Sequence, residues 1–419
     1  MESYNFTRVG DRMLVYKDNE KWKIILLLIN PFFAFIISFF SLKERSSIRI
    51  LYCFFVLFGF SLIVKLSNPD DCSRYLEEYL NFYHNPKDNF RSIWMDYTGD
   101  SDLRTIKDLY VYLVFYLSAI LFPGNYHLVW GINSIVFAFF YLKTLTYITS
   151  LDDYKNTWPF IILTLIFMFS NSIYCINSMR FFTALWIAVY ATFKIVIDKK
   201  WGYFLLLATT PLVHDTFSIY IVFVIISMIG RFMNMKPIVV LFVLSFIFSS
   251  IALNYIGNVA PYLPPYLQKQ LWSYTESEGA LEIISGERFG ALPLYAKILT
   301  RLPHYFVVLL LVLLIVNTKK LSKNSQQLLK FLVLFFSLVN FISIIPSCLR
   351  FYRAATPFLI YLWVANYKNL SKYNNLLLLA PFAYSYFVFQ WFRKMNLVFD
   401  PTLFLFPYPV QLVKTLFFG

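Results

Sequence analysis

Long apolar stretches separated by short polar segments run through most of this chain. A helix that spans a bilayer needs about 20 predominantly apolar residues, and most of these stretches approach that length. The pattern predicts an all-α polytopic membrane protein with about 12 transmembrane helices. The predicted spans fall near residues 24–42, 48–66, 126–148, 158–176, 179–197, 201–213, 216–230, 237–255, 303–317, 328–346, 354–367 and 374–391.

The charges between these spans predict how the chain crosses the membrane. With the 43–49 loop in the cytoplasm, the spans alternate so that most loop Lys and Arg residues lie on the cytoplasmic side, as the positive-inside rule requires. Both termini and two large loops, 67–125 and 256–302, are then expected outside. A shorter apolar run at 108–122 would reverse this order if it spanned, so we expect it to form a re-entrant or interfacial helix.

Composition agrees with a membrane protein, because 59% of the 419 residues are hydrophobic and only 14% are charged. Neither a repeat nor a low-complexity linker divides the chain, so we expect one integral-membrane domain over 1–419. The sequence has no P-loop, GxGxxG or HExxH motif, which excludes an ATP-driven pump on this chain. The four cysteines lack the spacing of a metal site, and the net charge of +14 follows from membrane topology, so no nucleic-acid partner is expected.

Ionisable residues stand at the ends of several predicted spans, all on the predicted outer side. Charges at membrane depth are costly and are commonly functional. Their gathering at one face predicts a membrane-embedded site for an anionic substrate. These residues are Asp70 and Asp71 after the second span, Arg180, His214, Arg350 and Arg353.

Arg350 and Arg353 are three residues apart and share one helical face, where two like charges repel unless an anion lies between them. A diphosphate would satisfy both, since guanidinium groups bind phosphate through two parallel hydrogen bonds. Arg180 opens a span on the outer side, where topology does not explain a positive charge, and we assign it the same role. The alternative for each arginine is a side chain that extends to the lipid headgroups.

The carboxylates and the histidine leave more than one role open. Asp70 or Asp71 can cap a surface helix, act as a general base or bind a metal ion. His214 precedes Asp215, which can orient its ring, and the imidazole can act as a general base or a hydrogen-bond donor. A residue that only packs at the interface is the alternative for His214.

Acidic and aromatic residues are mixed in both large outer loops. Carboxylates accept hydrogen bonds from hydroxyl groups and aromatic rings stack on the apolar faces of sugars, so the mixture suits a glycan. An aromatic belt at the membrane interface is the alternative. The candidate glycan-binding residues are Tyr75, Tyr79, Trp272, Tyr274, Glu287 and Arg288.

The order of these residues resembles the motifs of the EpsG-like (Wzy-type) polymerases of bacterial exopolysaccharide and O-antigen assembly. That family has an Asp followed by Tyr four residues on, Asn-x-x-Arg-x-x-x-Ala at a span start, a His with a small residue four later, and a late Arg. This chain departs from the pattern in a polar N-terminal extension and in Pro69, where the family has Gly, so Asp70 and Asp71 both stay open. The matching positions are Asp71 and Tyr75, with Tyr79 following; Asn177, Arg180 and Ala184; His214 and Ser218; and Arg350 or Arg353.

The resemblance implies a GT-C-like glycosyltransferase in the bacterial inner membrane, with its active site facing outward. Donor and acceptor would be oligosaccharides linked to undecaprenyl diphosphate. The three arginines would neutralise the diphosphate, and Asp71, Asp70 or His214 would accept the proton of the acceptor hydroxyl. No cofactor is implied, although the paired aspartates are compatible with a divalent cation. The bilayer and a chain-length regulator or flippase are the other expected partners.

Three other classes fit part of the pattern. A GT-C transferase that moves one sugar from a polyprenyl phosphate would use the same loop carboxylate. A flippase or transporter usually shows repeated halves, which this sequence lacks. A membrane-bound O-acyltransferase would place its histidine deeper in a helix than His214. The dependence on metal and the length of the product distinguish the first of these from a polymerase.

Overall fold

The computed structural model describes residues 20–66, 71–98, 108–248, 293–343, 348–398 and 407–418, which are helical nearly throughout and contain no β-strand. The helices of the first part are α1 (Glu20–Ile29), α2 (Pro31–Phe39), α3 (Arg45–Phe60), α4 (Asp71–Phe82), α5 (Pro86–Thr98), α6 (Leu109–Leu121), α7 (His127–Thr149) and α8 (Trp158–Ser170). Next come η1 (Ile173–Asn177), α9 (Met179–Val196), α10 (Tyr203–Ala208), α11 (Thr210–Val213), α12 (Phe217–Gly230) and α13 (Met235–Phe248). The last are α18 (Leu294–Val316), η3 (Thr318–Lys320), α19 (Lys323–Phe341), η4 (Cys348–Phe351), α20 (Tyr352–Ala365), η5 (Ser371–Leu379), α21 (Ala380–Val398) and α22 (Tyr408–Phe418).

Helices long and apolar enough to cross a membrane occur in this fold, which agrees with the predicted helical membrane protein. By length and composition they number four in the described ranges: His127–Thr149, Trp158–Asn177, Met179–Val196 and Leu294–Val316. Shorter apolar helices cover Leu109–Leu121, Tyr203–Val213, Phe217–Gly230 and Met235–Ile247.

Several of the predicted spans are broken into two helices. The run at 24–42 divides at Pro31, where the Asn30 side chain accepts a hydrogen bond from the Phe33 amide at 3.1 Å and caps α2. The run at 201–213 divides into α10 and α11 near Pro211. Proline has no amide hydrogen and restricts the residue before it, so it starts a new helix rather than continuing an old one.

The core of the bundle forms around α9, of which 83% is buried inside the molecule. Its Trp186 packs edge-on against Tyr141 of α7, with the ring centroids 4.5 Å apart. Helices α3 and α7 approach closely because Gly59 and Gly131 have no side chain; a Cβ at Gly59 would lie 2.4 Å from Ser134. Large apolar side chains are exposed along α1, α12, α13 and α18, as expected for a surface that faces lipid.

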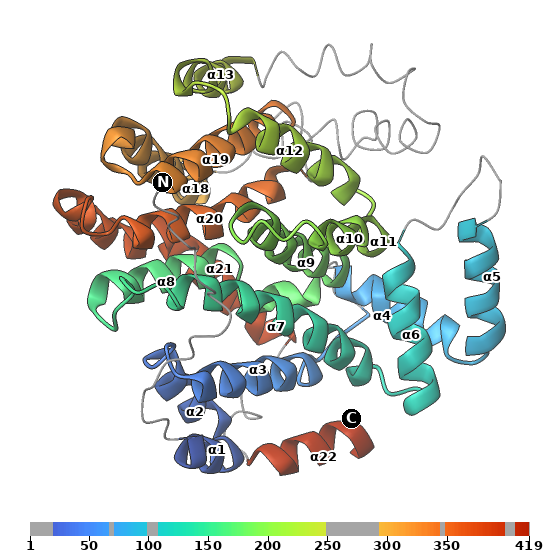
Figure 1. The fold of residues 1–419 in the computed structure, drawn as a ribbon. Helices are drawn as coiled ribbons and strands as arrows, with labels where there is room; N and C mark the ends of the chain where they lie inside the picture. Colours follow the sequence, from blue (N-terminus) through green and yellow to red (C-terminus); the bar gives the residue numbers. More distant parts are fainter. Residues whose placement is uncertain are drawn as a thin grey trace.

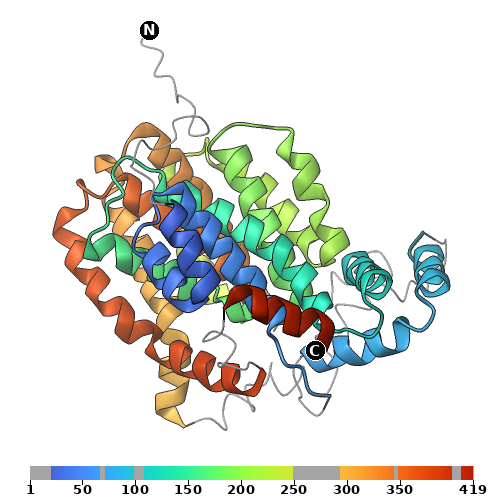
Figure 2. The same ribbon diagram turned by 90° about the horizontal axis from the view of Figure 1, so that it is seen from below.

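The helices α4, α5 and α6 lie together at one end of the bundle, at the right in Figure 1 and again at the right in Figure 2. They form most of the predicted outer loop 67–125, so this segment is a helical unit rather than an open loop. The helix predicted at 108–122 is present as α6 and contacts α7, α11 and α9. These contacts fix α6 beside the start of α9.

Two features of the C-terminal half differ from the sequence-based expectation. The end of the predicted outer loop 256–302 is helical from Leu294 onward, because α18 continues through Arg301 and Pro303 as one helix. The sequence analysis did not predict the helix α22, which packs against α1 and α3 with its Gln411 buried. The rest of the 256–302 loop lies outside the described residues.

Candidate functional site

Segments far apart in the sequence meet at the end of the bundle where α9 begins. Arg180 of α9 contacts Asp108 before α6 and Tyr75 of α4. The ring of Phe181 lies 5.5 Å from the ring of His214, between α11 and α12, and 5.4 Å from that of Phe351 in η4. We call this region the site end. The sequence-based prediction that Arg180, His214 and the late arginines share one face agrees with this placement.

Arg180 is held by two short hydrogen bonds. Its Nη1 donates to Oδ2 of Asp108 at 2.6 Å, and its Nε donates to the hydroxyl of Tyr75 at 2.6 Å. The guanidinium also lies over the Tyr75 ring, 5.2 Å from its centroid. The Asp108 side chain is only 5% exposed, whereas 27% of the Arg180 side chain is exposed. The Arg180 side chain therefore remains partly exposed beside a buried counter-charge.

Asp108 is a central residue of this site that the sequence analysis did not single out. It occupies the N-cap position of α6, yet its side chain makes no capping hydrogen bond there. Its Oδ1 instead accepts a hydrogen bond from the Asp215 amide at 3.1 Å, while Oδ2 binds Arg180. An acid directly before an apolar helix is the signal that would have marked it among the acidic residues of its loop.

His214 ends α11 and sits in the turn that leads to α12. Burial lowers its pKa to about 4; the Asp108 carboxylate opposes this shift, and Arg180 and Arg350 reinforce it. The ring is therefore neutral near pH 7. Its Nδ1 accepts a hydrogen bond from the Thr216 amide at 3.4 Å, which leaves the proton on Nε2. This tautomer favours a hydrogen-bond donor over the general base that the sequence also allowed.

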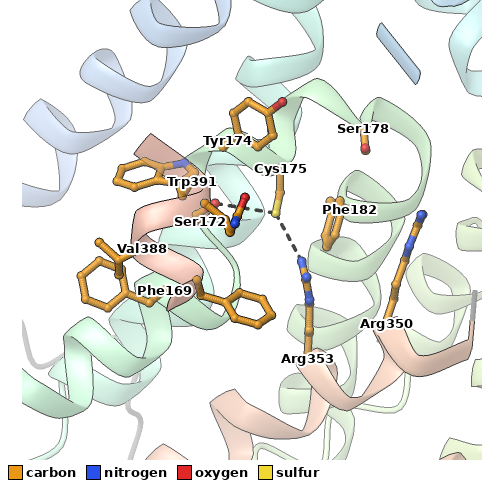
Figure 3. Close-up of a pocket in the computed structure, with 12 residues that line it drawn as sticks. Phe169, Ser172, Tyr174, Cys175, Ser178, Phe182, Arg350, Arg353, Val388 and Trp391 are labelled. Atoms are coloured by element: carbon orange, nitrogen blue, oxygen red, sulfur yellow. Dashed lines mark hydrogen bonds between the residues drawn. The ribbon is translucent and has the colours of Figure 1, made fainter. Parts of the chain in front are cut away.

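Arg350 and Arg353 line one side of a cavity of about 260 Å³ between α8, η1, α9, η4, α20 and α21. In Figure 3 both side chains rise from one segment and extend side by side. Arg353 Nη1 lies 3.6 Å from Cys175 Sγ. Within the described part of the chain, neither arginine forms an ion pair with a carboxylate. Two positive charges thus face the cavity without compensation.

The wall opposite the arginines is largely apolar, with Phe169, Val388 and Trp391 across the pocket in Figure 3. The indole Nε1 of Trp391 is buried and has no hydrogen-bond partner among the described residues. Ser172 and Ser178 add hydroxyl groups to the lining. The cavity therefore combines two guanidinium groups, further hydrogen-bond donors and an apolar wall, a set that suits an anion joined to a less polar group.

Other predicted site residues occupy different places. Asp71 is the first residue of α4, is 40% exposed and lies 3.5 Å from Arg74; it does not line the cavity. Arg180 does not line the cavity either, because Asp108 and Tyr75 hold it. In the described ranges no three His, Cys, Asp or Glu residues gather as a metal site would require. Asp70, Trp272, Tyr274, Glu287 and Arg288 lie outside the described residues.

Tyr75 and Tyr79 differ from the expectation that their rings contact a glycan. They are 2% and 0% exposed, and the Tyr79 ring packs against Phe115 of α6 with the centroids 5.6 Å apart. Tyrosines at i and i+4 share one helix face, and here that face is buried inside the bundle, with Tyr75 beside Arg180 and Tyr79 against α6. The two rings therefore hold α4 in place, and Tyr75 contributes its hydroxyl to Arg180.

Comparison with protein-family models, curated proteins and solved structures finds no match to this chain. The geometry of the site end is therefore the ground on which its function is argued.

Proposed function

We propose that this chain is a glycosyltransferase of the bacterial inner membrane that polymerises oligosaccharide repeat units linked to undecaprenyl diphosphate. The observation that carries the proposal is the cavity lined by Arg350 and Arg353, which form no ion pair with a carboxylate of the described residues. It lies at the end of a bundle whose exposed surface is apolar. The motif order that resembles the EpsG-like (Wzy-type) polymerases supports the same proposal.

The cavity suits the diphosphate of the donor. Two guanidinium groups can each bind phosphate oxygens in a fork, and together they stabilise the negative charge that develops as the diphosphate leaves. A volume of about 260 Å³ is below that of sites for drug-sized ligands, so it fits a small group rather than a whole glycan. In this assignment Trp391 and the serines contact the sugar or lipid next to the diphosphate.

The transfer needs one acceptor hydroxyl and no nucleotide. The acceptor oxygen forms a bond to the anomeric carbon of the donor, the bond from that carbon to the diphosphate breaks, and a carboxylate takes the hydroxyl proton. Asp71 or Asp70 is the proposed proton acceptor, and the Nε2 proton of His214 is a donor for a substrate oxygen. Holding both glycans at the site end supplies part of the rate through proximity.

The proposed architecture places the site end on the outer face of the membrane. It comprises about 12 spans in a GT-C-like arrangement over the single domain 1–419, with α6 as an interfacial or re-entrant helix. The positive-inside pattern of the loops supports this orientation. A chain-length regulator or a flippase is the proposed protein partner, and the lipid-linked glycans are both donor and acceptor.

A transfer assay with purified protein tests the proposal. The detergent-solubilised chain is incubated with an oligosaccharide linked to a polyprenyl diphosphate, without any nucleotide sugar, and the products are resolved on a gel. We expect a ladder spaced by whole repeat units. The matched control carries the same glycan on a polyprenyl monophosphate, which offers a poorer leaving group and should give no ladder.

Two outcomes would redirect the assignment. Transfer of one sugar from the monophosphate-linked donor, without a ladder from the diphosphate, would support the single-sugar GT-C alternative. Absence of any product from a folded preparation that receives the cognate repeat unit would overturn the glycosyltransferase proposal.

A further inference from the structure

Asp108 joins four segments of the site end. Its carboxylate contacts Arg180 of α9 and the Asp215 amide in the turn before α12, and it stands directly before α6. Through Arg180 it also reaches the Tyr75 hydroxyl of α4. No other described carboxylate forms an ion pair with Arg180.

The way in which Asp108 uses its two oxygens indicates a specific task. An aspartate at an N-cap position normally accepts hydrogen bonds from the first amides of its own helix. Asp108 makes no such bond, and each oxygen instead binds a different neighbouring segment. The carboxylate therefore orients neighbouring segments and leaves the first amides of α6 without a side-chain cap.

We propose that Asp108 is a positioning residue, which holds the Arg180 guanidinium and the His214 turn in the relative orientation that transfer requires. This inference rests on the proposed function and adds a residue that the motif pattern does not contain. It also moves Arg180 away from the diphosphate, because the cavity is lined by Arg350 and Arg353 and not by Arg180.

The orientation leaves donors available to a substrate. A guanidinium has five N–H groups, of which Arg180 uses one on Asp108 and one on Tyr75, and 27% of its side chain is exposed. The amide bound by Asp108 belongs to the residue after His214, so the same bond restrains the backbone that carries the imidazole. Arg180 and the Nε2 proton of His214 can then bind substrate oxygens outside the arginine cavity.

The test compares Asp108→Asn with Asp108→Glu and a matched control, Asp198→Asn. Asn keeps the shape but removes the charge that orients Arg180, whereas Glu keeps the charge on a longer side chain. Asp198 forms the corresponding pair at the other end of α9, with Lys194 at 2.9 Å. Asp198→Asn therefore shows how the loss of a partly buried ion pair affects turnover through stability alone.

Three readouts separate positioning from stability. Turnover and KM are measured in the transfer assay, and hydrogen exchange by mass spectrometry follows the peptide that contains Asp215. The third readout is protection of Cys175, which lines the cavity, from a small thiol reagent by inorganic pyrophosphate. Peptide mapping assigns the labelled cysteine.

For Asp108→Asn we expect kcat to fall by about 100-fold with KM nearly unchanged, since misplaced catalytic groups reduce turnover by this order. Exchange at the Asp215 amide should accelerate, and pyrophosphate should protect Cys175 as in the wild type. Asp108→Glu should recover part of the turnover. Asp198→Asn should lower thermal stability without changing the exchange at Asp215 or the kcat.

Wild-type exchange at Asp215 in Asp108→Asn, or wild-type kcat, would overturn the inference. So would a joint loss of turnover and Cys175 protection, because that pattern describes general distortion of the fold. A failure of the proposed function is distinguishable: the wild type would then form no ladder, while the exchange at Asp215 would still report whether Asp108 holds the turn.

Discussion

The two ends of α9 each carry a cluster of charged residues, and the clusters differ in their charge balance. At the C-terminal end, Lys194 pairs with Asp198 at 2.9 Å, and Tyr147 donates a hydrogen bond to the same carboxylate at 2.5 Å. The ammonium also lies 4.8 Å from the centroid of the Tyr147 ring. One cation meets one carboxylate four residues later, just after the end of the helix, so this cluster is complete without a ligand.

At the N-terminal end of α9 the cations exceed their described partners. Arg180 has Asp108, but Arg350 and Arg353 have no carboxylate within ion-pair distance in the described ranges. Uncompensated charges in a low-dielectric site are unfavourable, and an anion removes that cost. Both ends of α9 contain an ion pair, so the two ends differ in the charge that is left unbalanced among the described residues, and we place the substrate at the unbalanced end.

The largest effect is expected when the excess charge is removed. The double variant Arg350→Gln/Arg353→Gln should lower transfer by about 1,000-fold, because it removes the two groups to which we assign stabilisation of the leaving diphosphate. The measurement is the formation of the polymer ladder, with unreacted lipid-linked repeat units left in the mixture. Pyrophosphate should also cease to protect Cys175, which lines the same cavity.

Arg231→Gln is the control for that experiment. Arg231 follows the last residue of α12, about 20 Å from the His214 turn at the other end of this helix. The substitution removes one positive charge from the opposite end of α12 and should leave the ladder intact. Near-normal transfer in the double variant would show that the excess charge does not bind the donor.

The next effect concerns the pH dependence of stability. The His214 ring is faced by Asp108 from α6, Arg180 from α9, Arg350 from η4 and Asp71 from α4, and burial lowers its pKa to about 4. An unfolded imidazole takes up its proton near pH 6.5, as is usual for histidine. Native stability is therefore complete above pH 6.5 and should decline by about 3 kcal/mol as the pH falls from 6.5 to 4.

Thermal unfolding at a series of pH values checks this expectation. His214→Gln has no proton to take up, so part of the decline between pH 6.5 and 4 should disappear in that variant. His84→Gln replaces an exposed histidine at the end of α4 and serves as the control. Equal pH dependence in the wild type and in His214→Gln would contradict the neutral, buried state of the ring.

A smaller effect is expected from Arg180→Lys. The variant keeps the charge beside Asp108, but an ammonium cannot reproduce the planar fork that binds Asp108 and Tyr75 together. We expect kcat to fall by about tenfold while thermal stability stays close to the wild type. Measuring both quantities on one preparation separates orientation from folding, and an unchanged kcat would show that the charge alone is sufficient.

The sequence predicts more of the fold than of the candidate site. Apolar periodicity predicts the helices, and the predicted alternation of spans assigns Arg180, His214, Arg350 and Arg353 to one side. It does not resolve breaks within apolar runs, such as the one at Pro31, which depend on local capping. The sequence also does not show which charged residues pair. Asp108 lies 72 positions from Arg180, and only the packing of α6 against α9 brings them together.

The same limit explains the tyrosines of α4. Tyr75 and Tyr79 share a helix face whether that face meets a glycan or another helix, and periodicity alone does not distinguish these cases. The structure buries both, with Tyr79 against α6 and Tyr75 beside Arg180 of α9, and places a different aromatic residue, Trp391, at the cavity. Its signal in the sequence was weak, because it follows Gln390 in an ordinary apolar helix.

The smallest effect is expected from Trp391→Phe. The buried indole N–H of Trp391 has no partner in the described ranges, and phenylalanine removes it while keeping an aromatic wall. If this N–H binds a donor oxygen, one hydrogen bond is lost and KM for the donor should rise about fivefold with kcat unchanged. The control is Trp130→Phe, which removes an equally unpartnered N–H from the core, outside the cavity. Trp130→Phe should lower thermal stability without changing KM. If KM is similar in the two variants, the indole of Trp391 only packs in the wall, and Arg350 and Arg353 bind the donor without it.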